Sequence, residues 1–259
     1  MSGKSGAGHN AYWDRSSTPF VIKHNNEVIA HVGLLPFDFI IQENSFRAAA
    51  LHGICTKNEF RRKGHFKQLM QEALDEVKQH FDFAFLFTDK PYLYEQFGFK
   101  VVKEYDFIYA YSKQNAQKNK SRILDLDDPR DLLILQNHYQ NRVPLSKMFS
   151  IVNEITVATL NALHMPVCYL EELDVLVVYQ INDQILYVKD IIATKPCELD
   201  LILNCISNHH EKIVLQFIPD RFLKLPANPV EALTDGCIMI SEHFDLNWEY
   251  FRYPEPQRC

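Results

Sequence analysis

Two short apolar stretches flank one amphipathic stretch, and this arrangement constrains the fold more than any other feature of the chain. Residues 65–80 (HFKQLMQEALDEVKQH) place apolar side chains three and four positions apart, which predicts a helix with one apolar face. Residues 46–56 (FRAAALHGICT) precede it, and the nearly continuous apolar run 83–88 (FAFLFT) follows it, as in a strand buried on both faces. Strand, helix and strand in this order predict a right-handed crossover between parallel strands.

The segment before this crossover has the pattern of antiparallel strands. Residues 20–24 and 27–35 alternate in the manner of strands and flank Asn25-Asn26, a pair typical of a two-residue hairpin turn. Pro36 is expected to interrupt the second strand, and residues 43–45 (ENS) are expected to turn the chain again.

The remainder of the chain repeats this order in outline. Residues 130–141 and 150–163 are predicted to be helices, and a hairpin is predicted with its turn at Asn182-Asp183. A helix from about Pro196 and the strand 212–218 (KIVLQFI) follow. The repeated hairpin, helix and strand favour a duplicated architecture.

Composition excludes several classes of protein. The 33 acidic and 27 basic residues give a net charge of −6, so a protein that coats nucleic acid is not expected. No apolar run is long enough to span a membrane and the first residues do not resemble a secretory signal, so we expect a cytoplasmic protein. The six cysteines lack C-x-x-C pairing and are expected to be reduced.

The turn that opens the predicted helix is the best candidate for a binding site. Arg61, Arg62, Lys63 and Lys67 surround Gly64, which lets another group approach the backbone closely. Amide groups in the first turn of a helix have no partner within the helix and bind anions such as phosphate. The alternative is an ordinary solvated basic turn at the start of a helix.

Two motifs in this region resemble the GNAT superfamily of acyl-CoA-dependent N-acyltransferases. Residues 61–66 (RRKGHF) resemble its R-x-x-G-x-G/A pyrophosphate loop, and residues 94–99 (YEQFGF) are similar to its Y-E-x-x-G-F signature. The resemblance covers residues 20–111 and is nearest to the enhanced-intracellular-survival acetyltransferases. It implies a mixed α/β GNAT fold with a crossover, followed by a second, degenerate GNAT-like half.

The resemblance and the composition together predict four segments. Residues 1–18 form a mobile arm, 19–111 the catalytic GNAT domain, and 112–123, mostly polar and cationic, a linker. Residues 124–259 form the second GNAT-like domain. Its helix is preceded by ATKPCELD, which has neither glycine nor arginine, so no loop for coenzyme A is expected there.

The resemblance also assigns a role to the residues around the loop. It implies that acetyl-CoA binds with its pyrophosphate on the loop and its pantetheine arm along the strand before it, which should diverge from residues 83–88. Gly53 within that strand indicates a bulge or a close approach of another group to the backbone. Phe66 departs from the motif, which usually has glycine or alanine there. The implied cofactor-binding residues are Ile54, Cys55, Thr56, Arg61, Arg62, Lys63, Gly64, His65, Phe66 and Lys67.

Catalysis by direct attack of an amine on a thioester requires an acid and a base. The resemblance implies that Tyr94 is the acid that protonates the departing thiolate. The candidates for the base are the carboxylate of Cys259 at the end of the chain, as in the relatives named above, together with Glu27 and His52. His31 and Asp38 lie on the same predicted strands and are further candidates.

The resemblance therefore implies an N-acetyltransferase that moves an acetyl group from acetyl-CoA to a primary amine on a small molecule, a lysine or an N-terminus. The expected partners are acetyl-CoA and the amine, without nucleic acid or membrane, and an oligomer is possible. No metal is expected, because Cys197, Cys205, His209 and His210 match no common zinc spacing. The alternatives are a non-catalytic acyl-CoA sensor or effector and a protein-interaction module.

Overall fold

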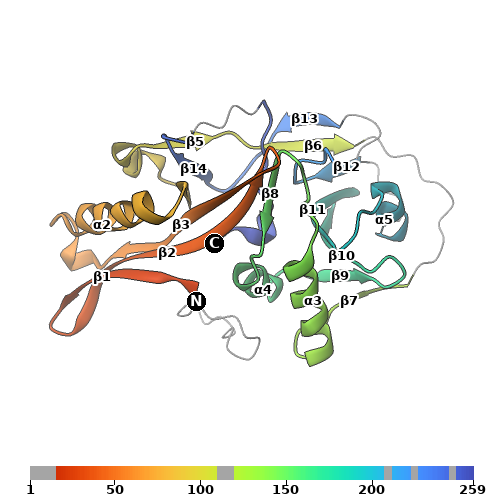
Figure 1. Cartoon of the computed structure of the whole chain (residues 1–259), viewed down its shortest axis with the longest axis horizontal. Helices are drawn as coiled ribbons and strands as arrows, with labels where there is room; N and C mark the ends of the chain where they lie inside the picture. Colours follow the sequence, from red (N-terminus) through yellow and green to blue (C-terminus); the bar gives the residue numbers. More distant parts are fainter. Residues whose placement is uncertain (1–15, 110–119, 207–211, 223–226, 245–248) are drawn as a thin grey trace.

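Two seven-stranded mixed sheets organise the molecule (Figure 1). This computed structural model describes residues 16–109, 120–206, 212–222, 227–244 and 249–259. Of the predicted mobile arm, residues 1–15 lie outside the described part, and the first strand begins at Thr18. None of the helices in the described ranges combines the length and the apolar composition needed to cross a membrane.

The first sheet contains the predicted crossover. Its strand order is β1-β2-β3-β4-β14-β5, and β8 also pairs with β2. Helix α2 (His65–His80) connects β3 to the parallel strand β4, so this prediction is confirmed. The strands are β1 (Thr18–His24), β2 (Glu27–Ile41), β3 (Asn44–Thr56), β4 (Phe83–Thr88), β5 (Phe99–Val102), β8 (Phe149–Val152) and β14 (Cys237–Ser241).

Helix α2 covers one face of this sheet. It buries Leu69, Met70, Ala73 and Val77, which recur at helical spacing and pack against β2, β3 and β4. The opposite face of the sheet contributes to a larger hydrophobic core shared with the second sheet. The two faces therefore differ, because one carries a single helix and the other is partly covered by the rest of the chain.

Backbone conformation places the hairpin turns. Asn25 and Asn26 have φ of 48° and 65°, which confirms the predicted turn between β1 and β2. The next turn lies at Gln42 and Glu43, with φ of 49° and 64°, so the predicted turn at 43–45 was displaced by about one residue. Both turns have the left-handed conformation that matches the twist of paired strands.

Pro36 does not interrupt the second strand as expected, because β2 continues through it to Ile41. The strand changes partners there instead. Strand β1 pairs with β2 as far as Leu34, and β8 pairs with the same strand from Asp38 onward. Proline has no N–H to donate, so it is tolerated at a position where one edge of the strand has no partner.

The second sheet has the order β13-β6-β12-β11-β10-β9-β7. Helix α5 (Leu199–Ile206) connects β11 to the parallel strand β12, so a second crossover is present. Helix α3 (Pro129–Asn141) confirms the prediction for 130–141. The strands are β6 (Tyr105–Tyr109), β7 (Ser121–Ile123), β9 (Val167–Leu170), β10 (Val175–Asn182), β11 (Ile185–Ala193), β12 (Lys212–Leu215) and β13 (Asn228–Glu231).

The helix predicted for residues 150–163 was wrong in its first part. Residues 149–152 form β8, and only Thr156–Ala162 form a helix, α4. Phe149, Ser150 and Ile151 are all buried beside β2, and this continuous burial is typical of a short strand covered on both faces. The second hairpin turns at Asp183 and Gln184, one residue later than predicted.

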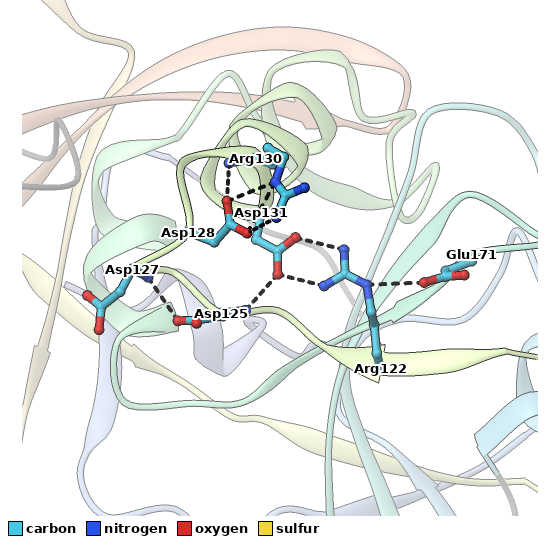
Figure 2. Close-up of polar contacts among 7 residues, drawn as sticks. All are labelled: Arg122, Asp125, Asp127, Asp128, Arg130, Asp131 and Glu171. Carbon is cyan, nitrogen blue, oxygen red and sulfur yellow. Dashed lines mark hydrogen bonds and ion pairs between the residues drawn. The ribbon is translucent and has the colours of Figure 1, made fainter.

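The end of the predicted linker is a strand. Residues 110–119 lie outside the described part, but Ser121–Ile123 form β7 and pair with β9. Side-chain contacts hold this strand in place (Figure 2). The Arg122 guanidinium donates two hydrogen bonds, of 2.6 and 2.7 Å, to the Asp131 carboxylate. It also contacts Glu171 at 3.1 Å. Asp128 caps α3 by accepting from the Arg130 N–H, so this corner is held by charge at several points (Figure 2).

The two sheets exchange strands, so the predicted boundary at residues 112–123 does not separate them. Strand β6 precedes the boundary but lies in the second sheet, while β8 and β14 follow it and lie in the first. Strands β5 and β6 therefore lie in different sheets. The final segment, including the buried Phe251 and Tyr253, packs into the core shared by the sheets. All six cysteines are free, as expected.

Candidate functional site

The turn before α2 presents unpartnered backbone donors. Gly64 is the N-cap of the helix, with φ of 87°, and no side chain caps the first turn. Arg62 also has a left-handed φ of 62°. A Cβ added to Gly64 would meet no atom within 4 Å, so the approach to the amides of His65, Phe66 and Lys67 is open there.

The basic side chains of this turn point away from the core. Arg61, Arg62, Lys63 and Lys67 are all exposed. The Arg61 Nε donates to the Thr56 carbonyl at 3.1 Å, and the Lys63 ammonium lies 4.9 Å from the centre of the Phe60 ring. Among the described residues, no carboxylate forms an ion pair with any of these four cations. Their charge is therefore available to an anion bound at the start of the helix.

Strands β3 and β4 separate shortly after they meet. They pair only at Ala48 with Phe83, Ala49 with Ala84 and Ala50 with Phe85. Strand β3 then continues to Thr56 and β4 to Thr88 without further pairing to each other. We call the region between these unpaired edges, residues 51–56 of β3 and 86–88 of β4, the slot. The expected divergence of these strands is confirmed.

A bulge in β3 lies beside this slot. Gly33 of β2 is opposite His52, whereas His31 is opposite Cys55, so β3 contains one extra residue at this point. Gly53 has φ of 58°, as expected of a glycine in a bulge. Beyond it, Ile54 and Thr56 are half-buried and Cys55 is exposed along the edge of the slot.

The register of the short ladder shows which side chains flank the slot. If it is continued beyond Ala50 and Phe85, Leu51 faces Leu86, His52 faces Phe87, and Gly53 faces Thr88. Leu51 and Leu86 are on the α2 face of the sheet, in the core beneath that helix. Phe87 is on the opposite face, in the core shared with the second sheet.

Tyr94 lies at the β4 side of the slot. It sits between two short helices, η3 (Pro91–Leu93) and η4 (Glu95–Phe97), and is 8% exposed. Its hydroxyl hydrogen bonds with the side chain of Thr88, the last residue of β4, and burial raises the pKa of Tyr94 above its ordinary value. Tyr94 therefore stays protonated near neutral pH and can donate a proton.

Phe66, the residue that departs from the motif, is accommodated by the core. Its ring packs edge-on against Tyr94 at 5.8 Å and against Phe97 at 5.4 Å. It is one of the partly buried residues of the core beneath α2. The bulk of this side chain thus supports Tyr94 from the helix side.

His52 is held beside the bulge on the face away from α2. Its Nε2 lies 2.7 Å from the Ser17 hydroxyl, and a Cβ on Gly33 would come within 2.5 Å of the same nitrogen, so glycine makes room for the ring. Burial, and then the neighbouring His31, lower the pKa of His52 below its ordinary value. His31 contacts the Gly53 carbonyl through Nδ1 at 2.8 Å.

The other candidates for the base lie in different surroundings. Glu27 is exposed at the start of β2, where it forms an ion pair with Lys57. Asp38 is opposite Arg47, beyond the closed end of the slot. Burial raises the pKa of the Cys259 thiol to about 12, and the predicted role of its carboxylate stays a prediction. Of these side chains, only those of His52 and His31 adjoin the bulge.

The last segment of the chain reaches the slot, and its individual contacts were not predicted. Tyr253 packs against Phe85 and Phe87 with ring centres 5.8 and 4.9 Å apart. The Arg258 guanidinium lies 5.0 Å from the centre of the Phe87 ring. From the sequence, only the candidate carboxylate of Cys259 was expected to bring the end of the chain to this site.

The second crossover has no comparable slot in the part of the chain that the structure describes. Strands β11 and β12 pair from Ile185 to Val188. Beyond that point, the Ala193 carbonyl accepts from the Val143 N–H at 2.8 Å and the Ile191 carbonyl accepts from Arg142 at 3.1 Å. The first turn of α5 carries Asp200 and no cation, so nothing there favours an anion.

The zinc site considered for Cys197, Cys205, His209 and His210 finds no support. His209 and His210 lie outside the described residues. Among the residues that are described, no three His, Cys, Asp or Glu side chains are grouped in a way that could hold a metal ion.

Comparison with known proteins finds a family model that matches part of the chain and solved structures with a similar fold. Residues 7–102 match the model of an acetyltransferase (GNAT) domain. No curated protein sequence matches the chain. A probable N-acyltransferase from Enterococcus faecalis V583 has a similar structure, with a TM-score of 0.56 and 13% identity over 87% of this chain and 62% of that chain.

Two further solved structures are similar. For Eis1 from Mycobacterium abscessus, the TM-score is 0.55 and the identity 13%, over 86% of this chain and 64% of that chain. For a GCN5-related N-acetyltransferase from Kribbella flavida, the values are 0.50 and 16%, over 85% and 59%. At these identities the likeness shows the fold alone, and the chain spans about three-fifths of the length of each neighbour.

Proposed function

We propose that this chain transfers an acetyl group from acetyl-CoA to a primary amine, because residues 7–102 match the model of a GNAT acetyltransferase domain. One observation carries the proposal: the open slot between β3 and β4 leads from a bulge to an uncapped, cationic helix start. A thioester with a long polar arm and a pyrophosphate at its far end fits this arrangement.

The residues present fit such a donor at both ends. The amides of His65, Phe66 and Lys67 and the cations around Gly64 bind the pyrophosphate. The unpaired edge of β3 at Ile54, Cys55 and Thr56 binds the amides of the pantetheine arm, as a sheet edge binds an added strand. No metal takes part in this proposal.

The protein then supplies orientation, charge stabilisation and proton transfer. A backbone N–H at the bulge polarises the thioester carbonyl, and the amine nitrogen attacks its carbon. The new C–N bond forms as the C–S bond breaks, and Tyr94 gives its proton to the departing thiolate. A base removes the proton from the amine, and Tyr94 regains its proton from solvent.

We assign the base to His52, because this candidate lies beside the bulge, contacts the Ser17 hydroxyl and has a lowered pKa. Its lowered pKa leaves it unprotonated near pH 7, so it can accept a proton. The His52 ring lies against Gly33, and its Nε2 contacts the Ser17 hydroxyl. Because the ring is held there, we expect a water molecule to carry the proton from the amine to it. Glu27, in contrast, is neutralised by Lys57.

Two measurements on the full chain test the proposal. Isothermal titration should show acetyl-CoA binding at one site, and a thiol-release assay over a panel of primary amines should show amine-dependent formation of free coenzyme A. Binding without release at any pH between 6 and 9 would instead favour a non-catalytic sensor. Absence of binding to acetyl-CoA would refute the proposal.

A further inference from the structure

The closed end of the slot has no free space at the level where β3 and β4 part. Ala50, Leu51, Phe85 and Leu86 are each exposed by 2% or less. Ala50 and Phe85 belong to the core shared by the two sheets, and Leu51 and Leu86 belong to the core beneath α2. Buried side chains therefore close this end of the slot on both faces of the sheet. A group that enters the slot therefore stops at this level unless a neighbouring side chain moves.

Phe87 is the half-buried side chain of β4 nearest to this closed end on the face away from α2. It faces His52 in the continued register, and its ring packs against Phe85 at 6.1 Å and Tyr253 at 4.9 Å. The Arg258 guanidinium covers it at 5.0 Å. With aromatic rings and a guanidinium behind it, the ring of Phe87 has little room to turn away from the slot.

The segment behind Phe87 is itself firmly anchored. Arg258 donates to both oxygens of the buried Glu104, at 2.6 and 2.7 Å, and the Tyr253 N–H donates to the same carboxylate at 3.1 Å. The Arg258 carbonyl accepts from the Asn161 side chain at 2.9 Å. These charge-assisted bonds resist displacement of the segment, so Phe87 cannot yield by pushing it aside.

We propose that Phe87, braced by Tyr253 and Arg258, is the residue that restricts the acyl donor to a short chain such as acetyl. This inference rests on the proposed function. The thioester is placed at the bulge, level with Gly53 and Thr88, so the acyl group extends toward Leu51, Leu86 and Phe87. Leu51 and Leu86 are fixed beneath α2, which leaves Phe87 as the wall that a longer chain would have to displace.

Binding measurements on the full chain test this without knowledge of the amine. Isothermal titration with coenzyme A, acetyl-CoA, butyryl-CoA and hexanoyl-CoA should give a dissociation constant for hexanoyl-CoA at least about 10-fold above that for acetyl-CoA. In Phe87→Ala the ratio of these two constants should fall to within about 3-fold. Phe87→Leu, a milder change, should lower the ratio in the same direction if the alanine variant does not fold.

Phe46→Ala is the matched control. Phe46 is also a half-buried phenylalanine of the first sheet that packs against another ring, Phe244 at 5.1 Å, but it lies at the opposite end of β3 from the bulge. Its removal should leave the ratio at the wild-type value. A ratio that changes equally in the Phe46 and Phe87 variants would show a general loss of packing and overturn the assignment.

The outcomes separate this inference from the function on which it rests. Equal binding of hexanoyl-CoA and acetyl-CoA by the wild type would overturn the inference while the proposed function stands. A selective wild type whose ratio is unchanged by both Phe87 variants would assign selectivity to another residue. Failure to bind coenzyme A or any acyl-CoA would overturn both.

Discussion

The two crossovers of this chain have the same topology but opposite surroundings. In β3–α2–β4 and in β11–α5–β12, a helix connects parallel strands that pair over only three and four residues, respectively. In the second crossover, Val143, Arg142 and Gln216 satisfy the backbone carbonyls of β11 beyond the ladder. In the first, the edge of β3 stays unpaired among the described residues.

This difference shows that an open slot is not a property of the crossover itself. Twisted parallel strands diverge wherever their ladder ends, and the exposed polar backbone then needs a partner. The second crossover finds it in the buried Arg142 and Asp190, whose side chains are bonded at 2.7 Å. The first has no such partner among the described residues, and cations surround Gly64 where the second crossover has Asp200.

The largest expected effect is a loss of stability in the second crossover, where Arg142 and Asp190 occupy the space beside β11. Asp190→Ala leaves the buried Arg142 guanidinium without its anion, so the free energy of unfolding should fall by about 3–5 kcal/mol. Arg62→Ala, the matched removal of a charge at the open crossover, should change it by less than about 0.5 kcal/mol. Urea denaturation measures both, and similar losses in the two variants would contradict the contrast.

Substitutions in the first crossover should instead change the affinity for acetyl-CoA. Gly64→Glu places a carboxylate beside the uncapped amides and should weaken acetyl-CoA binding by about 100-fold or more in isothermal titration. Gly64→Ala has the same unfavourable φ without the charge, so it should share the fall in melting temperature but lose far less affinity. Equal affinities of the two variants would show that the added negative charge does not cause the loss of binding.

Tyr94 tests whether the open slot performs chemistry. Tyr94→Phe keeps the ring beside Phe66 and removes the hydroxyl, so kcat should fall about 100-fold while the dissociation constant for acetyl-CoA stays within about 2-fold. Tyr92→Phe is the control, because Tyr92 is 65% exposed on the adjacent turn. Equal turnover in the Tyr94 variant and the wild type would exclude Tyr94 as the acid.

The smallest effect concerns the charged corner of the second sheet shown in Figure 2. Arg122 holds the pKa of Asp131 below its ordinary value, so the pair stabilises the folded state above about pH 4, the unfolded pKa of aspartate. This contribution should disappear as pH falls through the lower folded pKa. Arg122→Ala should cost about 1 kcal/mol or less at pH 7, and the difference from wild type should shrink as the pH falls below about 4. A difference that persists in acid would show a packing effect instead.

Local patterns predicted the first crossover well. The apolar spacing of α2, the glycine of the bulge and the basic turn are all encoded within 30 residues of one another, so period and composition were sufficient. The walls of the slot were not accessible in this way. Phe87 meets Tyr253 and Arg258, whose positions depend on bonds to Glu104 that no local pattern reports.

Pairing between distant parts of the chain explains why β8 was predicted as part of a helix and why β6 was assigned to the first domain. Strand β8 is four residues long, too short for its period to be distinguished from the start of a helix, and its partner β2 lies more than 100 residues earlier. The same holds for β6, whose neighbours β12 and β13 follow it by more than 100 residues. In each case the decisive contact was with a distant part of the chain.

The position of β14 has a consequence for biosynthesis. This strand, Cys237–Ser241, lies between β4 and β5, so those two strands have no direct contact in the ladder. A ribosome must therefore deliver the chain as far as Ser241 before the first sheet can close. Until then the nascent chain carries two unprotected strand edges, which are natural sites for chaperone binding and for aggregation.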